Sequence, residues 1–177
     1  MMPILRLRHL LRDLRAHLVG TATIEFALWS ILVFVLLLPC LDLAAYLVAG
    51  SSMGAAVDQA AILAYDMRNS DTIDTTRLSG YVASTAWVPN GTPSTKITCN
   101  GEQQSCAASL ANRPCACVSG LSPIYTPAAV CGMACPSGAT SGFYLTVQAQ
   151  VTYQPMIVPD RWLAGSTLAR SVTVRLQ

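Results

Sequence analysis

Residues 26–41 read FALWSILVFVLLLPCL and contain no charged side chain. As an α-helix this run is about 24 Å long, slightly shorter than the hydrocarbon core of a bilayer. Extending it from Asp42 to Ala49 gives a sufficient span if Asp42 lies near the far interface. The sequence therefore predicts one membrane-spanning helix over residues 21–49.

The charges on either side of this run predict how the chain is oriented. Four of the eleven basic residues fall within the first fifteen positions, whereas the acidic Asp58 and Asp66 lie beyond the run. Because basic residues are retained on the cytoplasmic side, residues 1–20 are expected in the cytoplasm and the remainder outside. From Thr21 onward the chain has 7 basic and 8 acidic residues, which excludes a nucleic-acid-binding face.

The overall composition argues against a soluble enzyme. The 177 residues are 53% hydrophobic and 11% charged, against roughly 25% charged in ordinary soluble domains. Both histidines, His9 and His17, lie in the basic stretch, and the only carboxylates after Asp74 are Glu102 and Asp160. No phosphate-binding loop or nucleophile motif is present. We therefore expect no enzymatic activity, no cofactor and no metal.

The helix is expected to continue past the membrane. Residues 53–67 (MGAAVDQAAILAYDM) are rich in alanine and lack proline, so helix is predicted to about Arg68, with residues 50–69 as a stalk. Pro39 removes one backbone hydrogen bond and can kink the helix. Two pairs with small-x-x-x-small spacing, Ala45 with Ala49 and Gly50 with Gly54, allow another helix to approach closely. The alternative is simply an alanine-rich helix.

Residues 70–177 are predicted to form a small extracytoplasmic α+β domain. A short helix is expected over residues 75–86 with Asp74 as its N-cap. Two turn signals, Asn90-Gly91 and Asn100-Gly101, bracket a short strand over residues 95–99.

Two longer strands close the chain. Residues 143–154 (FYLTVQAQVTYQ) alternate apolar and polar side chains, which predicts a half-buried strand. In the second strand Leu168, Val172, Val174 and Leu176 share one face, and Arg170 interrupts that face, as at a sheet edge. The connection over residues 155–165 is too short for a crossover helix, so the pair is expected to be antiparallel.

Six of the seven cysteines lie in a loop-rich stretch, residues 99–135: Cys99, Cys106, Cys115, Cys117, Cys131 and Cys135. An even number in an exported segment predicts disulfides, with fifteen possible connectivities. The alternative is a metal site in which Cys115-x-Cys117 and Cys131-x3-Cys135 each supply two thiolates. The oxidising location and the absence of a nearby histidine favour disulfides. The seventh, Cys40, is expected to be a free thiol in the membrane.

The junction between the basic stretch and the apolar run reads Gly20-Thr21-Ala22-Thr23-Ile24-Glu25-Phe26. It resembles the processing site of class III type IV pilin-like proteins, in which a prepilin peptidase cuts after the glycine. Glu25 then becomes the fifth residue of the mature chain. Glu25-Phe26 followed by alanine resembles in particular the TadE-like pseudopilins of the tight-adherence (Tad, or Flp) pilus. The C-terminal stretches TVQAQVTYQPMIVP and LARSVTVRL are also similar to that family, whereas the cysteine-rich insert departs from it.

The resemblance implies a minor pilin or pseudopilin in the bacterial inner membrane, with residues 1–20 as its leader. Its implied partners are the prepilin peptidase, other Tad pilins and pseudopilins, and the pilus assembly platform. The resemblance also implies a single-pass protein that takes part in pilus assembly, adhesion or secretion and can itself be incorporated into the pilus.

Glu25 also has a physical interpretation independent of the family. A buried charge costs at least about 2.5 kcal/mol at the bilayer centre and less near an interface. Cleavage after Gly20 would create an α-amino group about one helical turn away, and in pilin-like assemblies the implied role of Glu25 is to meet that amine on an adjacent subunit. The alternative is a glutamate that is favoured near a helix N-terminus.

Two other functions remain compatible with parts of the sequence. Residues 37–40 (LLPC) are weakly similar to a lipobox, which would make Cys40 a lipidated N-terminus, although Pro39 fits poorly. A signal-anchored extracytoplasmic binding module with no pilus role would explain the disulfides equally well. It leaves the spacing of Gly20 and Glu25 as a coincidence.

Overall fold

The computed structural model describes residues 3–120, 123–156 and 165–177, with side chains from Thr21 onward. The chain divides into two compact units, residues 1–43 and residues 44–177. Helix α1 (Pro3–Asp66) supplies all of the first unit that is described and continues into the second, and η1 (Met67–Asn69) extends it by one 3₁₀ turn. The helix is continuous through Pro39 and through Gly50-Ser51-Ser52, in agreement with the prediction of helix to about Arg68.

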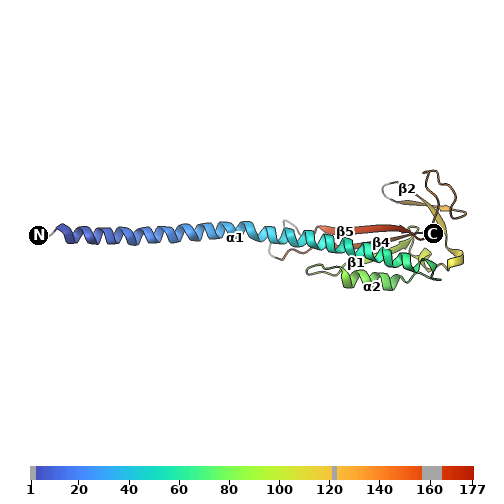
Figure 1. The fold of residues 1–177 in the computed structure, drawn as a ribbon, viewed down its shortest axis with the longest axis horizontal. Coiled ribbons are helices and arrows are strands. Elements are labelled where there is room, and N and C mark those ends of the chain that lie inside the picture. Colours follow the sequence, from blue (N-terminus) through green and yellow to red (C-terminus); the bar gives the residue numbers. More distant parts are fainter. Residues whose placement is uncertain (1–2, 121–122, 157–164) are drawn as a thin grey trace. The chain divides into compact units, whose positions relative to one another are not determined.

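The second unit combines the end of α1 with one short helix and two antiparallel sheets (Figure 1). Helix α2 (Thr75–Thr85) begins where the sequence predicted, because the Asp74 carboxylate accepts a hydrogen bond of 2.9 Å from the Arg77 amide. The three-stranded sheet has the order β1-β4-β5, and its strands are β1 (Ser94–Cys99), β4 (Tyr144–Thr152) and β5 (Thr167–Arg175). Both pairings in this sheet are antiparallel, as expected for the predicted α+β fold.

Because apolar and polar side chains alternate along β4 as predicted, one face of this sheet is buried and the other is partly exposed. Leu145, Val147 and Ala149 are fully buried, whereas the intervening Thr146, Gln148 and Gln150 are partly or fully exposed. The buried face packs against α1, whose buried residues recur at helical spacing: Ala49, Met53, Ala56, Val57, Ala60 and Ala64. Small side chains on α1 let the helix lie close to the sheet.

Arg170 lies on the same face of β5 as Leu168 and Val172, as its register with Ala149 shows. It reaches over α1, because a Cβ atom added at Gly50 would lie 3.5 Å from its Nη2 atom and one at Gly54 3.9 Å from its Nε atom. Gly50 and Gly54 therefore border a side chain of their own chain. β5 is an edge strand, which confirms the prediction made from the break at Arg170.

A second, two-stranded sheet was not predicted. β2 (Cys115–Ser119) pairs with β3 (Ile124–Ala128), and two short 3₁₀ helices precede them, η2 (Gln104–Ala107) and η3 (Leu110–Asn112). This region has little hydrophobic periodicity, so its strands carry no sequence signal. Most of the predicted connection over residues 155–165 lies outside the described residues.

The turn signal Asn100-Gly101 is confirmed as a two-residue hairpin. Cys99 and Glu102 exchange backbone hydrogen bonds of 2.9 and 3.1 Å, and both central residues have positive φ, 50° at Asn100 and 87° at Gly101. Gly101 has a second reason to be glycine, because an added Cβ would lie 2.9 Å from the ring of Tyr125. The turn of the hairpin thereby lies against the Tyr125 side chain of β3.

Candidate functional site

The apolar part of α1 exposes hydrophobic side chains on all sides. From Ile24 to Leu37 every large hydrophobic side chain is between 45% and 75% exposed. A helix that packs on a soluble core would bury one stripe, as α1 itself does beyond Ala49. Within the described residues α1 is the single helix that is long and apolar enough to cross a membrane. Its first part is therefore a single-pass membrane anchor.

The predicted processing and assembly residues lie on this helix. Thr21 and Glu25 are four residues apart, so they share one face of α1 and are separated by about 6 Å along its axis. The side chains of Glu25 and Phe26 are exposed, the latter to 75%. Gly20 is a helical residue in the range whose side-chain surroundings are not described. The spacing places the carboxylate one turn from the amine that cleavage after Gly20 would create.

All six predicted disulfide cysteines are paired in the structure. Cys99 is bonded to Cys106, Cys115 to Cys131, and Cys117 to Cys135, with Cα–Cα distances of 5.1, 5.3 and 5.7 Å. These distances lie within the range that a disulfide spans. Cys40 is free and exposed on α1. The expectation of a disulfide-rich region among small sheets is confirmed.

Two of the disulfides fasten one loop to one strand. Cys115 and Cys117 are two residues apart on β2 and therefore share one face of the strand. Their partners, Cys131 and Cys135, lie in the loop that follows β3. Ala116, between them, exchanges backbone hydrogen bonds of 2.8 and 3.0 Å with Gly142. The four sulfurs that the alternative metal site required are thus used in covalent bonds, and the described residues hold no cluster of three metal-ligating side chains. We call β2, β3 and residues 129–142 the cysteine-rich lobe.

Arg113 ties this lobe to the end of the long helix. Its guanidinium donates hydrogen bonds to the backbone carbonyls of Arg68 and of Ser70, the latter at 2.6 Å, and lies 5.3 Å from the centre of the Phe143 ring. Burial lowers the pKa of Arg113 from its ordinary value, and the negative charge of Asp71 offsets part of that effect. Because arginine stays protonated in proteins, a buried cation satisfies carbonyls left open where α1 ends.

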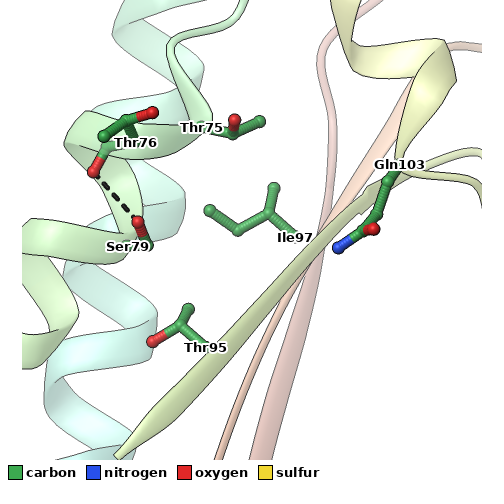
Figure 2. A pocket seen from close by; sticks show the side chains of 6 residues that line it. All are labelled: Thr75, Thr76, Ser79, Thr95, Ile97 and Gln103. Atoms are coloured by element: carbon green, nitrogen blue, oxygen red, sulfur yellow. Dashed lines mark hydrogen bonds between the residues drawn. The ribbon is translucent and has the colours of Figure 1, made fainter.

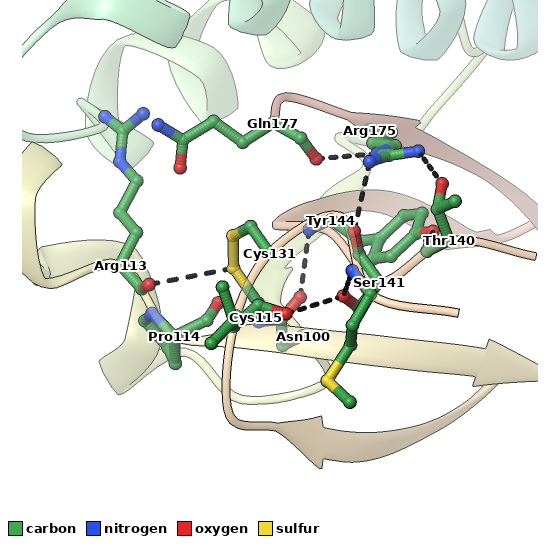
Figure 3. The surroundings of a disulfide bond; sticks show 12 residues. Asn100, Arg113, Pro114, Cys115, Cys131, Thr140, Ser141, Tyr144, Arg175 and Gln177 are labelled. Carbon is green, nitrogen blue, oxygen red and sulfur yellow. Dashed lines mark hydrogen bonds between the residues drawn. A yellow bond between two sulfur atoms is a disulfide. The ribbon is translucent and has the colours of Figure 1, made fainter. Parts of the chain in front are cut away.

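A second arginine closes the other side of the lobe (Figure 3). Arg175 donates to the hydroxyl of Thr140 at 2.6 Å, to the carbonyl of Ser141 at 3.0 Å and to that of Gln177 at 2.7 Å. Gly142 is required here, because an added Cβ would overlap the Gln177 carbonyl and lie 2.5 Å from Arg175 Nε. Sequence patterns did not single out Arg113 or Arg175, since isolated arginines carry no periodic or spacing signal.

A polar groove of about 350 Å³ lies between α2 and β1. Figure 2 shows that its lining comes from both elements and from Gln103, with Ser79 donating to the carbonyl of Thr76 at 3.0 Å. The lining is made of hydroxyl groups, one amide and one apolar side chain: Thr75, Thr76, Ser79, Thr95, Ile97 and Gln103. It contains no residue capable of general acid or base catalysis near neutral pH.

Residues 20–61 match the family of TadE-like proteins. The match begins at Gly20, includes Glu25 and Phe26, and covers 42 of the 177 residues. No curated protein and no solved structure matches the chain. The TadE-like match confirms the resemblance identified at the junction. It does not reach the C-terminal strands, for which the resemblance stays a prediction.

We call the unit formed by residues 44–177 the head. The TadE-like segment, residues 20–61, ends within the part of α1 that belongs to the head. Its first part is the exposed apolar stretch of α1, and four of its last residues pack on the sheet: Met53, Ala56, Val57 and Ala60. The cysteine-rich lobe lies wholly outside the matched segment. The TadE-like family is a pilus structural family. Because the match ends at residue 61, it covers only the apolar part of α1 and the start of the head.

Proposed function

We propose that the chain is a minor pilin or pseudopilin of a Tad-type pilus, trimmed by a prepilin peptidase after Gly20. The observation that carries this proposal is the match to TadE-like proteins, which starts at that glycine and continues through the exposed apolar helix. A prepilin peptidase must recognise the leader from the cytoplasmic side, which agrees with the position of the basic residues before Thr21.

In this proposal the anchor serves two successive purposes. Before cleavage it holds the precursor in the inner membrane, with residues 44–177 on the periplasmic side, where disulfides form. After cleavage the charge-free surface from Phe26 to Leu37 packs against the helices of neighbouring subunits. The Glu25 carboxylate then meets the α-amino group of Thr21 on an adjacent subunit, which removes two isolated charges from the apolar interior.

Gly20→Val is expected to block cleavage and to leave the full precursor in the membrane. The branched side chain replaces the glycine at the residue before the cut, while the charges and the apolar run that direct insertion are unchanged. Immunoblotting of membrane and sheared-pilus fractions would show one band of precursor mass and none in the pili. Gly80→Ala is the matched control, because an added Cβ at Gly80 contacts nothing within 4 Å. Normal processing of the Gly20→Val protein would contradict the assignment of the cleavage site.

A further inference from the structure

Three residues whose types have affinity for a membrane surface lie on or beside α1 where its apolar stretch ends: Tyr46 on the helix, and Trp87 and Arg170 beside it. We call them the collar. All three belong to the unit formed by residues 44–177, so their arrangement is internal to it. The guanidinium of Arg170 lies along Gly50 and Gly54, as the distances of 3.5 and 3.9 Å given above show.

Trp87 flanks the same level of the helix from another side. Its amide donates a hydrogen bond of 2.8 Å to the hydroxyl of Ser52, and its side chain is 53% exposed. Ser52 lies between Gly50 and Gly54 in sequence, and two residues along an α-helix correspond to a rotation of about 200°. Trp87 and Arg170 therefore flank α1 on nearly opposite sides and at nearly the same height.

Tyr46 lies one turn before Gly50 and is held by the head. Its ring meets the buried ring of Tyr153 edge-on, with 5.2 Å between their centres. Its own side chain keeps partial exposure. The collar thus places two aromatic residues and one arginine along about two turns of α1.

Few carboxylates of the described residues lie at this level. Residues 44–57, 86–93, 150–156 and 165–170 contain none, and the nearest on α1 are Asp42, buried one turn before Tyr46, and Asp58, one turn beyond Gly54. Within the described part of the chain the guanidinium of Arg170 makes a single long hydrogen bond, 3.4 Å to the carbonyl of Ala169. Arg170 is exposed, and its planar guanidinium has the geometry for the bidentate contact that arginine makes with phosphate.

We propose that the collar binds the phospholipid headgroups of the bilayer surface from which α1 emerges. Arg170 takes a lipid phosphate, and Trp87 and Tyr46 lie among the headgroups, where aromatic side chains anchor membrane proteins. The collar follows directly on the apolar stretch that ends at Ala49, and this continuity identifies the membrane as its occupant. The collar fixes how far the head stands from the bilayer. This inference rests on the membrane anchor and is independent of the pilus role.

Quenching of Trp87 by brominated lipids tests the contact. The full chain carrying Trp29→Phe and Trp162→Phe retains Trp87 alone and is reconstituted into vesicles of phosphatidylcholine and phosphatidylglycerol, with bromine near the headgroup end of the acyl chains. Strong quenching of Trp87 is expected. The matched control carries Trp29→Phe, Trp87→Phe, Trp162→Phe and Ile124→Trp, so that its one tryptophan lies on the cysteine-rich lobe. Ile124 is 62% exposed and accepts the larger side chain. The control is expected to be unquenched, because this tryptophan is not part of the collar. Equal quenching of the two proteins, or none in either, would overturn the proposal.

The part played by Arg170 is measured in the same vesicles. Arg170→Gln is expected to lower the ratio of the quenched to the unquenched Trp87 population, given by the amplitudes of the two fluorescence lifetimes, about fivefold, as for one basic side chain at an anionic surface. Arg77→Gln, which removes an exposed arginine of α2, is expected to leave the ratio unchanged. High salt on the protein with Arg170 intact should reproduce the loss without any substitution at Arg170. A ratio insensitive to both salt and Arg170→Gln would contradict the phosphate contact.

Discussion

Glu25→Gln is expected to leave membrane insertion and cleavage after Gly20 intact and to lower incorporation into pili about tenfold or more. Glutamine keeps the size of the side chain and removes its charge, so the α-amino group of a neighbouring Thr21 stays unpaired in the apolar interior. A charge left at the centre of an apolar layer costs at least about 2.5 kcal/mol and less near its edge, and each 1.4 kcal/mol corresponds to a factor of ten in association. The measurement is the amount of mature protein in sheared pili relative to that in membranes.

Asp58→Asn is the matched control for Glu25→Gln. Asp58 is also an exposed carboxylate on α1, but it lies in the head beyond the apolar stretch. Its removal is expected to leave incorporation unchanged. If Glu25→Gln entered pili as efficiently as Asp58→Asn, Glu25 would be an ordinary interfacial glutamate and the proposed pairing would be wrong.

The double variant Cys117→Ser, Cys135→Ser is expected to destabilise the unit of residues 44–177 by about 3 kcal/mol. The bond closes a loop of 18 residues, and removing it returns that loop's conformational freedom to the unfolded chain. For a unit of this size the loss corresponds to a drop of about 10 °C in the melting temperature. Thermal unfolding followed by near-ultraviolet circular dichroism, in detergent and without reductant, measures it.

Cys40→Ser is the control for this variant, since Cys40 is the free and exposed cysteine of the membrane anchor. It is expected to melt at the temperature of the unsubstituted protein. Peptide mapping without reduction checks the pairing itself and should recover Cys117 linked to Cys135. An unchanged melting temperature in the double variant, or recovery of another pairing, would contradict the disulfide arrangement described above.

The elements that the sequence predicted are those specified by local signals. The charge-free run predicts the anchor, the Asp74 side chain predicts the start of α2, and the alternation along residues 143–154 predicts β4 and its buried face. Each of these follows from residues that are near one another in the chain. The break at Arg170 likewise predicted an edge strand, because a long cation needs a route to solvent.

The features that escaped prediction depend on contacts between distant residues. Fifteen pairings of six cysteines are equivalent in sequence, and the choice follows from how β2 lies against the loop after β3. Arg113 meets carbonyls more than forty residues earlier in the chain. The pair Gly50 and Gly54 satisfied the spacing for helix association, but the structure places Arg170 of the same chain against it.

The candidate processing and assembly residues could be proposed from the sequence because they lie within seven consecutive residues, and their roles stay predictions. Gly20, Thr21 and Glu25 are related by spacing alone, and a helix preserves that spacing in the structure. The part played by the cysteine-rich lobe is not encoded in this way. Two disulfides and the hydrogen bonds of Arg113 and Arg175 hold the lobe in place. No pattern in its sequence specifies a ligand.

The N-terminus and intact mass of the membrane-extracted protein, from cells with and without the prepilin peptidase, test the central claim most directly. A pilin-type protein predicts a mature chain that begins at Thr21 and carries three disulfides, found only when the peptidase is present. An uncut chain in both strains would contradict the proposal and favour a signal-anchored binding module. A chain beginning at a lipid-modified Cys40 would contradict it equally and identify a lipoprotein.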